Sequence, residues 1–209
     1  LIRNPEYVGY LKLTYDIGRI GRVDRQITYK HCLSSCEVSQ AIKRAIDMGK
    51  TPSGFGIQLE SAAKTSFLPF SDKCYEWGVI FREFMPYPYV NEQVVLIPCF
   101  SLFGQDINNP DDECILIQLI EVQKANPYEF VKQLLFMIID CYWEIVLSCA
   151  FHIECHSQNC FFEIDRNYSI RRFIIKDMDS VDKDIPLARF LGVRSDWESY
   201  PVMCFDQKV

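Results

Sequence analysis

Polar side chains that could bind a metal ion or a nucleotide crowd one short stretch of the sequence. Glu154, His156, Gln158 and Asn159 lie within six residues, directly after the most apolar part of the chain, and a carboxylate, Asp177, follows. Amide and carboxylate oxygens are ligands that Mg²⁺ accepts, and protein-bound Mg²⁺ usually also contacts nucleotide phosphates. Asn159 and Asp177 are therefore candidate metal ligands, and His156 and Gln158 could hold phosphate or sugar oxygens. The alternative is a polar helix end that leads into a hairpin and binds nothing.

Two short apolar runs must bring these residues together. Residues 160–164 and 172–175 have the composition of buried strands, and Asn167 between them suits a turn. Two strands of this length, paired as a hairpin, return to the same edge of a sheet. We therefore expect Asn159 and Asp177 to lie at one end of a β-hairpin.

A second polar stretch lies much earlier in the chain, around Lys64. We predict that a strand over residues 56–60 enters a turn whose hydroxyls come from Ser61, Thr65 and Ser66. Short hydroxyls and free backbone N–H groups can approach a phosphate closely. The stretch is a candidate anion-binding turn, although turns of this composition are also common on protein surfaces.

Arginines supply further candidate anion ligands. Arg82 lies near the end of a predicted buried strand, residues 77–84, and a guanidinium there must find an anion or a row of carbonyl groups. Residues 18–21 contain two glycines but do not complete a phosphate-binding loop, so a plain turn is favoured. Three arginines near that turn could still face an anion: Arg19, Arg22 and Arg25.

The patterns as a whole predict an α+β fold. A mixed, largely antiparallel sheet would pack on a helical half, with the polar loop and hairpin in a palm-like arrangement. We expect an N-terminal sheet region over residues 1–110 and a helical half with the loop and hairpin over residues 111–209. Strands are predicted over residues 10–17 and 93–103, and helices over 34–48, 114–124 and 126–153.

Each predicted long helix has a recognisable start. Ser34 with Glu37 three residues later forms a capping box, and Gly49 would end that helix. Asn126 followed by Pro127 is a strong helix start.

The apolar run from Leu134 to Ile153 is long enough to raise the possibility of a membrane span. Asp140 and Glu144 lie inside it, and each would cost about 2.5–3.5 kcal/mol at a bilayer centre. They are four residues apart and share one helix face. The sequence therefore favours a central core helix with one polar stripe, and we expect the two acids to be hydrogen-bonded or solvated rather than catalytic.

Composition narrows the class of protein. The 209 residues are 49% hydrophobic and carry a net charge of −6, which suits an ordinary folded protein and argues against a general nucleic-acid surface. The ten cysteines show no zinc-ribbon spacing, so we interpret them as reduced thiols in a cytoplasmic protein. The chain begins with Leu1 and has no signal-peptide pattern, and we expect it to be a fragment of a longer protein.

Three of these motifs resemble those of a known family, the siderophore synthetases that are independent of nonribosomal peptide synthetases (the aerobactin-synthetase, or IucA/IucC, family). Residues 154–159 look like that family's Glu-x-His-x-Gln-Asn loop, and Lys176-Asp177-Met178 looks like its Arg-Asp-Phe segment. Residues 61–65, followed by Arg82, look like its Ser-x-x-Arg-Thr nucleotide turn and the next strand arginine. The motifs occur in the family's order and span roughly residues 10 to 180.

The resemblance implies an ATP-dependent ligase of siderophore synthesis and iron acquisition. Such enzymes adenylate a polycarboxylic acid, often citrate or a derivative, and pass the acyl group to an amine, hydroxylamine or alcohol, with release of AMP and pyrophosphate. The implied cofactors are ATP and Mg²⁺. The protein would act without nucleic acid or membrane, and a homodimer is a further expectation.

The resemblance also assigns roles to residues. The implied phosphate and nucleotide contacts are Ser61, Lys64, Thr65, Arg82, His156, Gln158 and Asn159. The implied metal ligands are Glu154, Asn159 and Asp177, and the implied catalytic residues are Lys64, Arg82 and His156.

The sequence departs from the family in two places. Lys64 replaces the arginine of the nucleotide turn, and the family's N-terminal His-Pro-rich motif is absent. The chain resembles the central, palm-like part of a full synthetase, as a fragment or a degenerate homologue. Two other readings stay open: a kinase-like small-molecule phosphotransferase and a non-catalytic nucleotide-binding protein.

Overall fold

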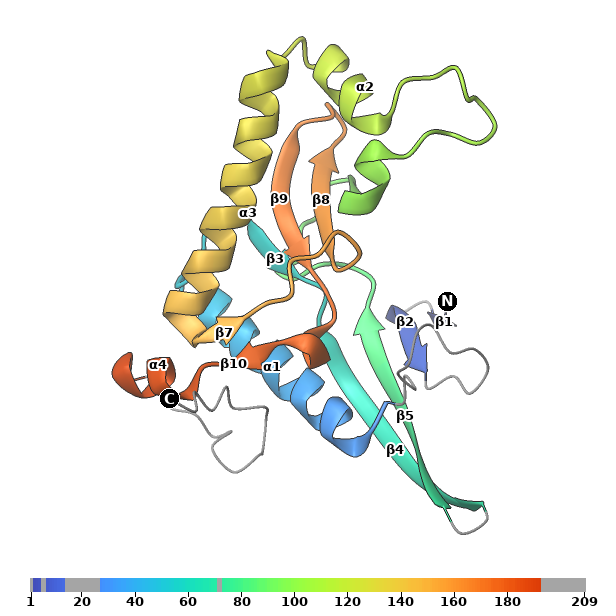
Figure 1. The fold of residues 1–209 in the computed structure, drawn as a ribbon, viewed down its shortest axis with the longest axis vertical. Coiled ribbons are helices and arrows are strands. Elements are labelled where there is room, and N and C mark those ends of the chain that lie inside the picture. The colour runs from blue at the N-terminus through green and yellow to red at the C-terminus, as the bar shows by residue number, and fades with distance from the viewer. Residues whose placement is uncertain (1, 5–6, 14–26, 71–72, 193–209) are drawn as a thin grey trace, which may run out of the picture.

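A computed structural model shows an α+β fold in which helices pack on two four-stranded sheets, as predicted (Figure 1). A two-stranded sheet joins β7 (Phe151–His152) to β10 (Asp182–Lys183). The structure describes residues 2–4, 7–13, 27–70 and 73–192. The predicted turn at residues 18–21 and the arginines Arg19, Arg22 and Arg25 lie outside the described residues.

The first sheet is antiparallel and has the strand order β1-β2-β5-β4. Helix α1 lies against β4 and β5 of this sheet. The strands are β1 (Ile2–Asn4), β2 (Tyr7–Leu13), β4 (Glu60–Phe70) and β5 (Lys73–Glu83). The predicted strand at 10–17 is confirmed as far as Leu13, and the rest of that range lies outside the described residues.

Helix α1 (Tyr29–Asp47) begins earlier than predicted. Its N-cap is Thr28, whose hydroxyl accepts from the backbone N–H of His31, so the predicted start at Ser34 is wrong. The backbone N–H of Thr28 in turn donates to His31 Nδ1 at 3.2 Å, so a histidine takes the place of the usual Glu or Gln in this capping box. The predicted end is right, because Gly49 follows with a φ of 65°.

The second sheet contains the predicted hairpin. Its strand order is β3-β9-β8-β6, with β3 parallel to β9 and the other pairs antiparallel. The two edge strands come from before residue 110 and the two central strands from after it, so the two predicted parts of the chain share one sheet. The strands are β3 (Phe55–Ile57), β6 (Val94–Pro98), β8 (Cys160–Asp165) and β9 (Ile170–Ile175).

Helix α3 (Pro127–Cys149) runs along the edge of the molecule (Figure 1). The predicted start is confirmed, because the Asn126 side chain accepts from the backbone N–H of Glu129 at 3.2 Å. The prediction of a central core helix is wrong. One face of α3 is buried, but large apolar side chains as well as Asp140 and Glu144 are exposed on the other face. No helix within the described ranges is long and apolar enough to cross a membrane.

Shorter elements complete the described chain. The predicted strand over 93–103 ends at Pro98 and continues as the 3₁₀ helix η1, because Pro98 removes a donor from the ladder. The core lies between α1, α3 and the second sheet, with Phe55, Phe151 and Phe173 among its most buried side chains. The remaining elements are η1 (Cys99–Phe103), α2 (Ile115–Val122), η2 (Met178–Ser180) and α4 (Ile185–Phe190).

Candidate functional site

A fully buried carboxylate, Glu60, lies where α1, the first sheet and the end of the hairpin meet. Its oxygens accept bonds from the Ser35 hydroxyl, from Arg82 Nε at 2.9 Å and from the backbone N–H of Met178 at 3.1 Å. Its own backbone N–H donates to Ser39 Oγ at 3.0 Å. The α1 sequence places both serines on the buried face of the helix, so this face is shaped to hold an acid.

The predicted anion-binding turn after Glu60 is a strand. Residues 61–66 belong to β4 and pair with β5, so the prediction of a turn is wrong. Ser61 and Lys64 are exposed, and Thr65 is partly buried. Residues 61–66 contain no large apolar side chains and so lack the alternation of apolar and polar residues that usually marks a strand. For that reason the stretch resembled a turn. That Ser61, Lys64 and Thr65 contact a nucleotide stays a prediction.

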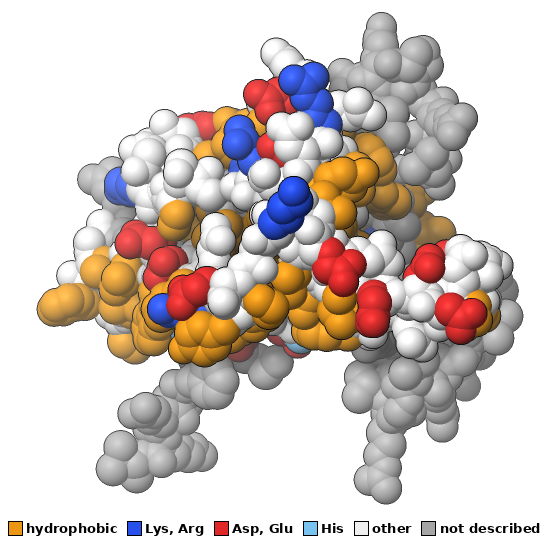
Figure 2. All heavy atoms as spheres, turned by 90° about the horizontal axis from the view of Figure 1, so that it is seen from above, with side chains coloured by type: hydrophobic (Ala, Val, Ile, Leu, Met, Phe, Trp, Pro, Cys, Tyr) orange, Lys and Arg blue, Asp and Glu red, His pale blue; other side chains and the backbone are white. Residues whose placement is uncertain are grey.

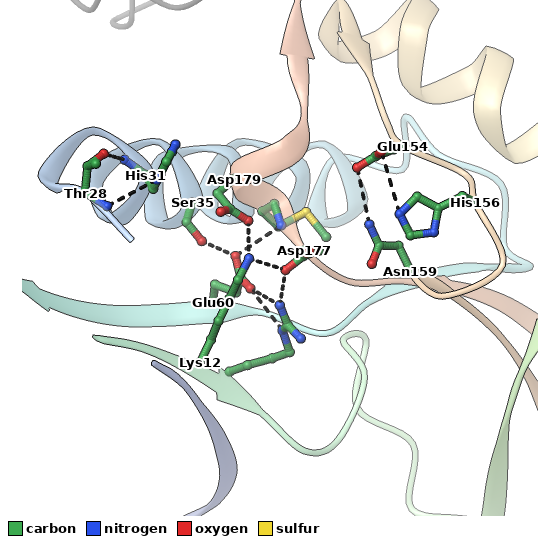
Figure 3. Close-up of polar contacts among 12 residues, drawn as sticks. Lys12, Thr28, His31, Ser35, Glu60, Glu154, His156, Asn159, Asp177 and Asp179 are labelled. Atoms are coloured by element: carbon green, nitrogen blue, oxygen red, sulfur yellow. Dashed lines mark hydrogen bonds and ion pairs between the residues drawn. The ribbon is translucent and has the colours of Figure 1, made fainter. Parts of the chain in front are cut away.

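Asp177 lies at the end of the hairpin and joins two cations. Lys12 Nζ is 2.5 Å from its Oδ1, and Arg82 Nη2 is 2.6 Å from the same atom (Figure 3). Burial opposes ionisation of Asp177, but Lys12 and then Arg82 outweigh it, so the pKa of this carboxyl lies below its ordinary value. The φ of Asp177 is 73°, a left-handed conformation that is uncommon for a residue other than glycine.

The polar loop forms a separate cluster beside this network (Figure 3). The Glu154 carboxylate lies 3.6 Å from His156 Nε2 and accepts from Asn159 Nδ2 at 3.5 Å. The backbone N–H of Lys176 donates to the Asn159 carbonyl at 3.0 Å, so the two ends of the hairpin are adjacent as predicted. Asn159 is buried, whereas His156 and Gln158 are exposed.

A cationic cavity of about 710 Å³ opens on one side of Asp177. Three cations line it, Lys12, Arg82 and Lys176, and no acid does among the described residues. The half-buried Lys176 ammonium sits over the Phe161 ring at 5.1 Å. Burial, and then the charges of Arg82 and Lys12, lower the pKa of Lys176 below its ordinary value. A bound anion would relieve that repulsion. The apolar and aromatic lining includes Tyr10, Phe84, Val94, Leu96 and Phe161.

An acid-rich cavity of about 850 Å³ lies beside α1 and the β7–β10 pair. Burial lowers the pKa of its Lys183, whose Nζ lies 3.9 Å from Glu37 Oε2. The described residues give it four carboxylates and two lysines: Glu37, Glu154, Asp179, Asp182, Lys30 and Lys183.

One ion pair links the two cavities. Lys12 lines the cationic cavity, and its Nζ lies 2.6 Å from Oδ1 of Asp179, which lines the acid-rich cavity. The short segment 176–183 therefore contributes to both cavities, with Lys176 on one side and Asp179 on the other.

Comparison with solved structures identifies the fold. Petrobactin biosynthesis protein AsbB of Bacillus anthracis superposes with a TM-score of 0.73 at 17% identity, over 93% of this chain and 32% of AsbB. ATP-bound aerobactin synthetase IucA of Klebsiella pneumoniae gives 0.69 at 13% identity, over 93% and 36%. Aerobactin synthetase IucC of the same species gives 0.63 at 17% identity, over 84% and 30%.

This chain has the siderophore-synthetase fold. It spans about a third of the length of these proteins. No protein-family model matches the sequence, and no curated protein is significantly similar to it. At these identities the likeness is one of fold, and the sequence motifs add the resemblance described above.

Magnesium does not fit the residues of this candidate site as they are arranged. The Asp177 carboxylate is already neutralised by two protein cations, and Glu154 faces His156 and Asn159. Within the described ranges, no three His, Cys, Asp or Glu side chains are grouped closely enough to hold a metal ion. The assignment of Glu154, Asn159 and Asp177 as Mg²⁺ ligands stays a prediction that this geometry does not support.

The sequence alone did not point to several members of the candidate site. Lys12 lies in an alternating strand far from the other residues, and nothing local marks it. Glu60 could have been noticed as an acid at the end of an apolar strand, opposite an arginine that needs an anion. Lys176 was noticed only as part of a motif. Asp179 lies in η2, and no local pattern in the sequence marks it.

Proposed function

We propose that this chain is the nucleotide- and carboxylate-binding part of an ATP-dependent ligase of the siderophore-synthetase kind. The observation that carries the proposal is the cationic cavity: Lys12, Arg82 and Lys176 line it, and within the described residues only Asp177 and its neighbours Glu60 and Asp179 offset their charge. Attack of a carboxylate on ATP brings several anions together, so cations and positioning dominate such catalysis.

The proposed reaction has two steps. A carboxylate oxygen of a polycarboxylic acid, such as citrate, attacks the α-phosphorus of ATP, and pyrophosphate leaves. An amine or hydroxylamine nitrogen then attacks the acyl carbon, loses a proton, and AMP leaves. Arg82 is already fixed by Glu60 and Asp177 and would hold negative charge at the α-phosphate or acyl group. Lys176 would pair with a second anionic group.

The acid-rich cavity suits the second substrate of this reaction. A protonated amine would be attracted by Glu37, Glu154 and Asp182, and it would pass one proton to a carboxylate of this cavity before its nitrogen attacks. The Lys12–Asp179 pair lies between the amine and the anions. The loop residues His156, Gln158 and Asn159 lie beside Glu154 and are proposed to contact the nucleotide. Because the proposed reaction consumes ATP, we propose that the protein is cytoplasmic.

The test is product identification. Purified chain is incubated with ATP, citrate and hydroxylamine, and AMP, ADP, pyrophosphate and hydroxamate are measured. AMP and hydroxamate in equal amounts support the proposal. ADP instead of AMP supports the kinase-like alternative, and tight ATP binding without either product supports the non-catalytic one.

A matched pair of lysine variants localises the site. Lys176→Ala should weaken ATP or citrate binding by about 10- to 100-fold, as expected for loss of a charge-assisted contact of about 1.5–3 kcal/mol. Lys50→Ala, an exposed lysine outside both cavities, is the control. Calorimetry of the two variants decides whether the cationic cavity is the binding site, and equal binding by both would remove it from the proposal.

A further inference from the structure

Two cysteines stand at the ends of the polar loop. Cys155 precedes His156, and Cys160 follows Asn159 as the first residue of β8. Between them the chain forms a tight turn, because the backbone N–H of Asn159 donates to the carbonyl of His156 at 2.9 Å. The first and fourth Cα atoms of such a turn lie within about 7 Å of each other, and a disulfide joins Cα atoms about 4.4–6.8 Å apart. Cys155 and Cys160 flank this turn directly, and a hydrogen bond joins their thiols, so a disulfide can span the two residues.

The two thiols differ in their access to solvent. Cys160 is 2% exposed and pairs with Ile175 in the ladder of β8 and β9, so its position is fixed. Cys155 is partly buried and lies outside the strands. It is less exposed than the large hydrophobic side chains that lie open on the upper surface of the molecule (Figure 2). A small uncharged oxidant such as hydrogen peroxide would therefore reach Cys155 first.

We propose that Cys155 and Cys160 form a reversible disulfide when the protein meets hydrogen peroxide. The Cys155 sulfur attacks one peroxide oxygen, the O–O bond breaks, and a sulfenic acid and one water form. The Cys160 sulfur then attacks the Cys155 sulfur, the S–O bond breaks, and the Cys160 proton leaves with the hydroxide as a second water. The two thiols together lose two electrons, and the peroxide gains them. Disulfides in cytoplasmic proteins are mostly of this transient, redox-sensing kind.

Closing the disulfide must move one end of the loop. A covalent S–S bond is shorter than any contact between unbonded sulfurs, and β8 holds Cys160 in place. The movement therefore falls on Cys155 and on its two neighbours, Glu154 and His156, whose side chains lie 3.6 Å apart (Figure 3).

The rest of the loop cannot follow this movement freely. The Phe100 backbone N–H donates to the Ser157 carbonyl at 3.2 Å, and the Lys176 N–H donates to the Asn159 carbonyl at 3.0 Å. Oxidation would thus displace His156 relative to Asn159. That this displacement weakens ATP binding rests on the proposed function, whereas formation of the disulfide does not.

The experiment identifies the oxidised pair by mass. The full 209-residue chain is treated with hydrogen peroxide, its remaining thiols are alkylated, and it is cleaved by a protease that cuts after glutamate. Residues 155–163 lie between two such cleavage points, Glu154 and Glu163, so both cysteines fall in one peptide. This peptide should carry no alkyl group and be two hydrogens lighter than its reduced form, and dithiothreitol should restore both thiols.

Two results of this experiment would overturn the proposal. One is alkylation of both Cys155 and Cys160 at a peroxide concentration that already oxidises other cysteines of the chain. The other is a pair of linked peptides that joins Cys155 to Cys99, the partly buried cysteine that begins η1.

Matched variants and calorimetry measure the consequence for the loop. In the original chain, ATP affinity should fall by about tenfold on oxidation and recover with dithiothreitol, because small displacements of a binding group cost affinity. Cys155→Ser and Cys160→Ala should keep their ATP affinity in peroxide. Cys114→Ser is the control and should respond as the original chain does, since Cys114 is also partly buried but caps α2.

The two readouts keep the disulfide and the nucleotide site separate. Equal ATP affinity of the reduced and the oxidised chain would overturn the regulatory role of the disulfide. A reduced chain that binds no ATP would count against the proposed function alone, because the peptide mass reports the disulfide independently.

Discussion

The two cavities beside Asp177 differ in sign although one segment of the chain serves both. The cationic cavity has Lys12, Arg82 and Lys176 in its wall and no described acid, whereas the acid-rich cavity has four carboxylates against two lysines. The change occurs within residues 176–183, where the left-handed conformation of Asp177 turns the chain from the hairpin toward the acid-rich side.

In the proposed reaction, this difference would keep oppositely charged ligands apart. A bound anion and a bound amine would otherwise attract each other, or compete for the same side chains. The Lys12 ammonium pairs with both Asp177 and Asp179. These ion pairs lie between the two cavities and form a boundary in which negative and positive charges alternate. The comparison predicts that the ion pairs of the boundary matter for stability as well as for binding, and that side chains found only in a cavity wall matter for binding.

The largest expected effect concerns the boundary. Arg82→Leu should reduce the free energy of unfolding by about 3–5 kcal/mol, because it leaves the fully buried Glu60 carboxylate without its cation. Urea denaturation measures the change. Arg171→Leu is the matched control, because Arg171 is exposed and lies 3.9 Å from Asp165. Replacing both Arg82 and Glu60 by leucine should recover much of the loss; equal losses in the single and double variants would contradict the role of this ion pair.

The next effect separates the two cavities by ligand. Glu37→Gln should raise the KM for the amine or hydroxylamine by about tenfold and leave ATP binding unchanged, because Glu37 lines only the acid-rich cavity. Steady-state kinetics and ATP calorimetry on the same variant measure both. Glu92→Gln, an exposed acid in neither cavity, is the control. A variant that loses ATP affinity and amine affinity together would show that the cavities are not independent.

The sequence predicted the hairpin well because its signals are local. Apolar runs, a turn at Asn167 and strand length fix where residues 160 and 175 pair, so the adjacency of Asn159 and Lys176 could be expected. The α+β class and the α3 start also follow from local pattern and capping.

The Glu60 network could not be predicted in this way. Its donors come from α1, β5 and η2, and no short-range rule relates Ser35 to Met178. The start of α1 was missed because His31 replaces the usual capping-box acid. The exposed face of α3 was missed because an apolar stripe at helical spacing gives the same pattern whether a core or another surface covers it.

A third prediction distinguishes an ion pair from a metal site at Asp177. Asp177→Asn should increase ATP affinity by about two- to fivefold, because it releases Lys12 and Arg82 from a competing carboxylate. If Asp177 instead bound Mg²⁺ together with the nucleotide, the same variant should lose affinity in the presence of Mg²⁺. Calorimetry with and without Mg²⁺ measures both outcomes. Asp165→Asn, in the hairpin turn, serves as the control.

The smallest expected effect is the change of ATP affinity with pH. It depends on a difference among the cations of the cationic cavity, because the pKa of one is lowered and the pKa values of the other two are raised. The pKa values of Lys12 and Arg82 are raised by their acidic neighbours, despite burial, so both remain charged through pH 10. The pKa of Lys176 is lowered by burial and by those two cations, so this side chain loses its proton first as pH rises. Because only the protonated lysine attracts a phosphate or carboxylate, ATP affinity should be greatest below the pKa of Lys176 and should fall above it.

A bound anion favours the protonated form, so the fall should begin at a higher pH in the complex than in the free protein. Phosphate groups with a pKa near ~6 are fully ionised in this range and contribute no change of their own. The matched variant is Lys176→Arg, whose guanidinium keeps its charge at every pH used. Calorimetry between about pH 7 and 10 should show a decline of about twofold for the original chain and a nearly level profile for Lys176→Arg. Parallel profiles for the two proteins would mean that another group controls anion binding and that Lys176 only lines the wall.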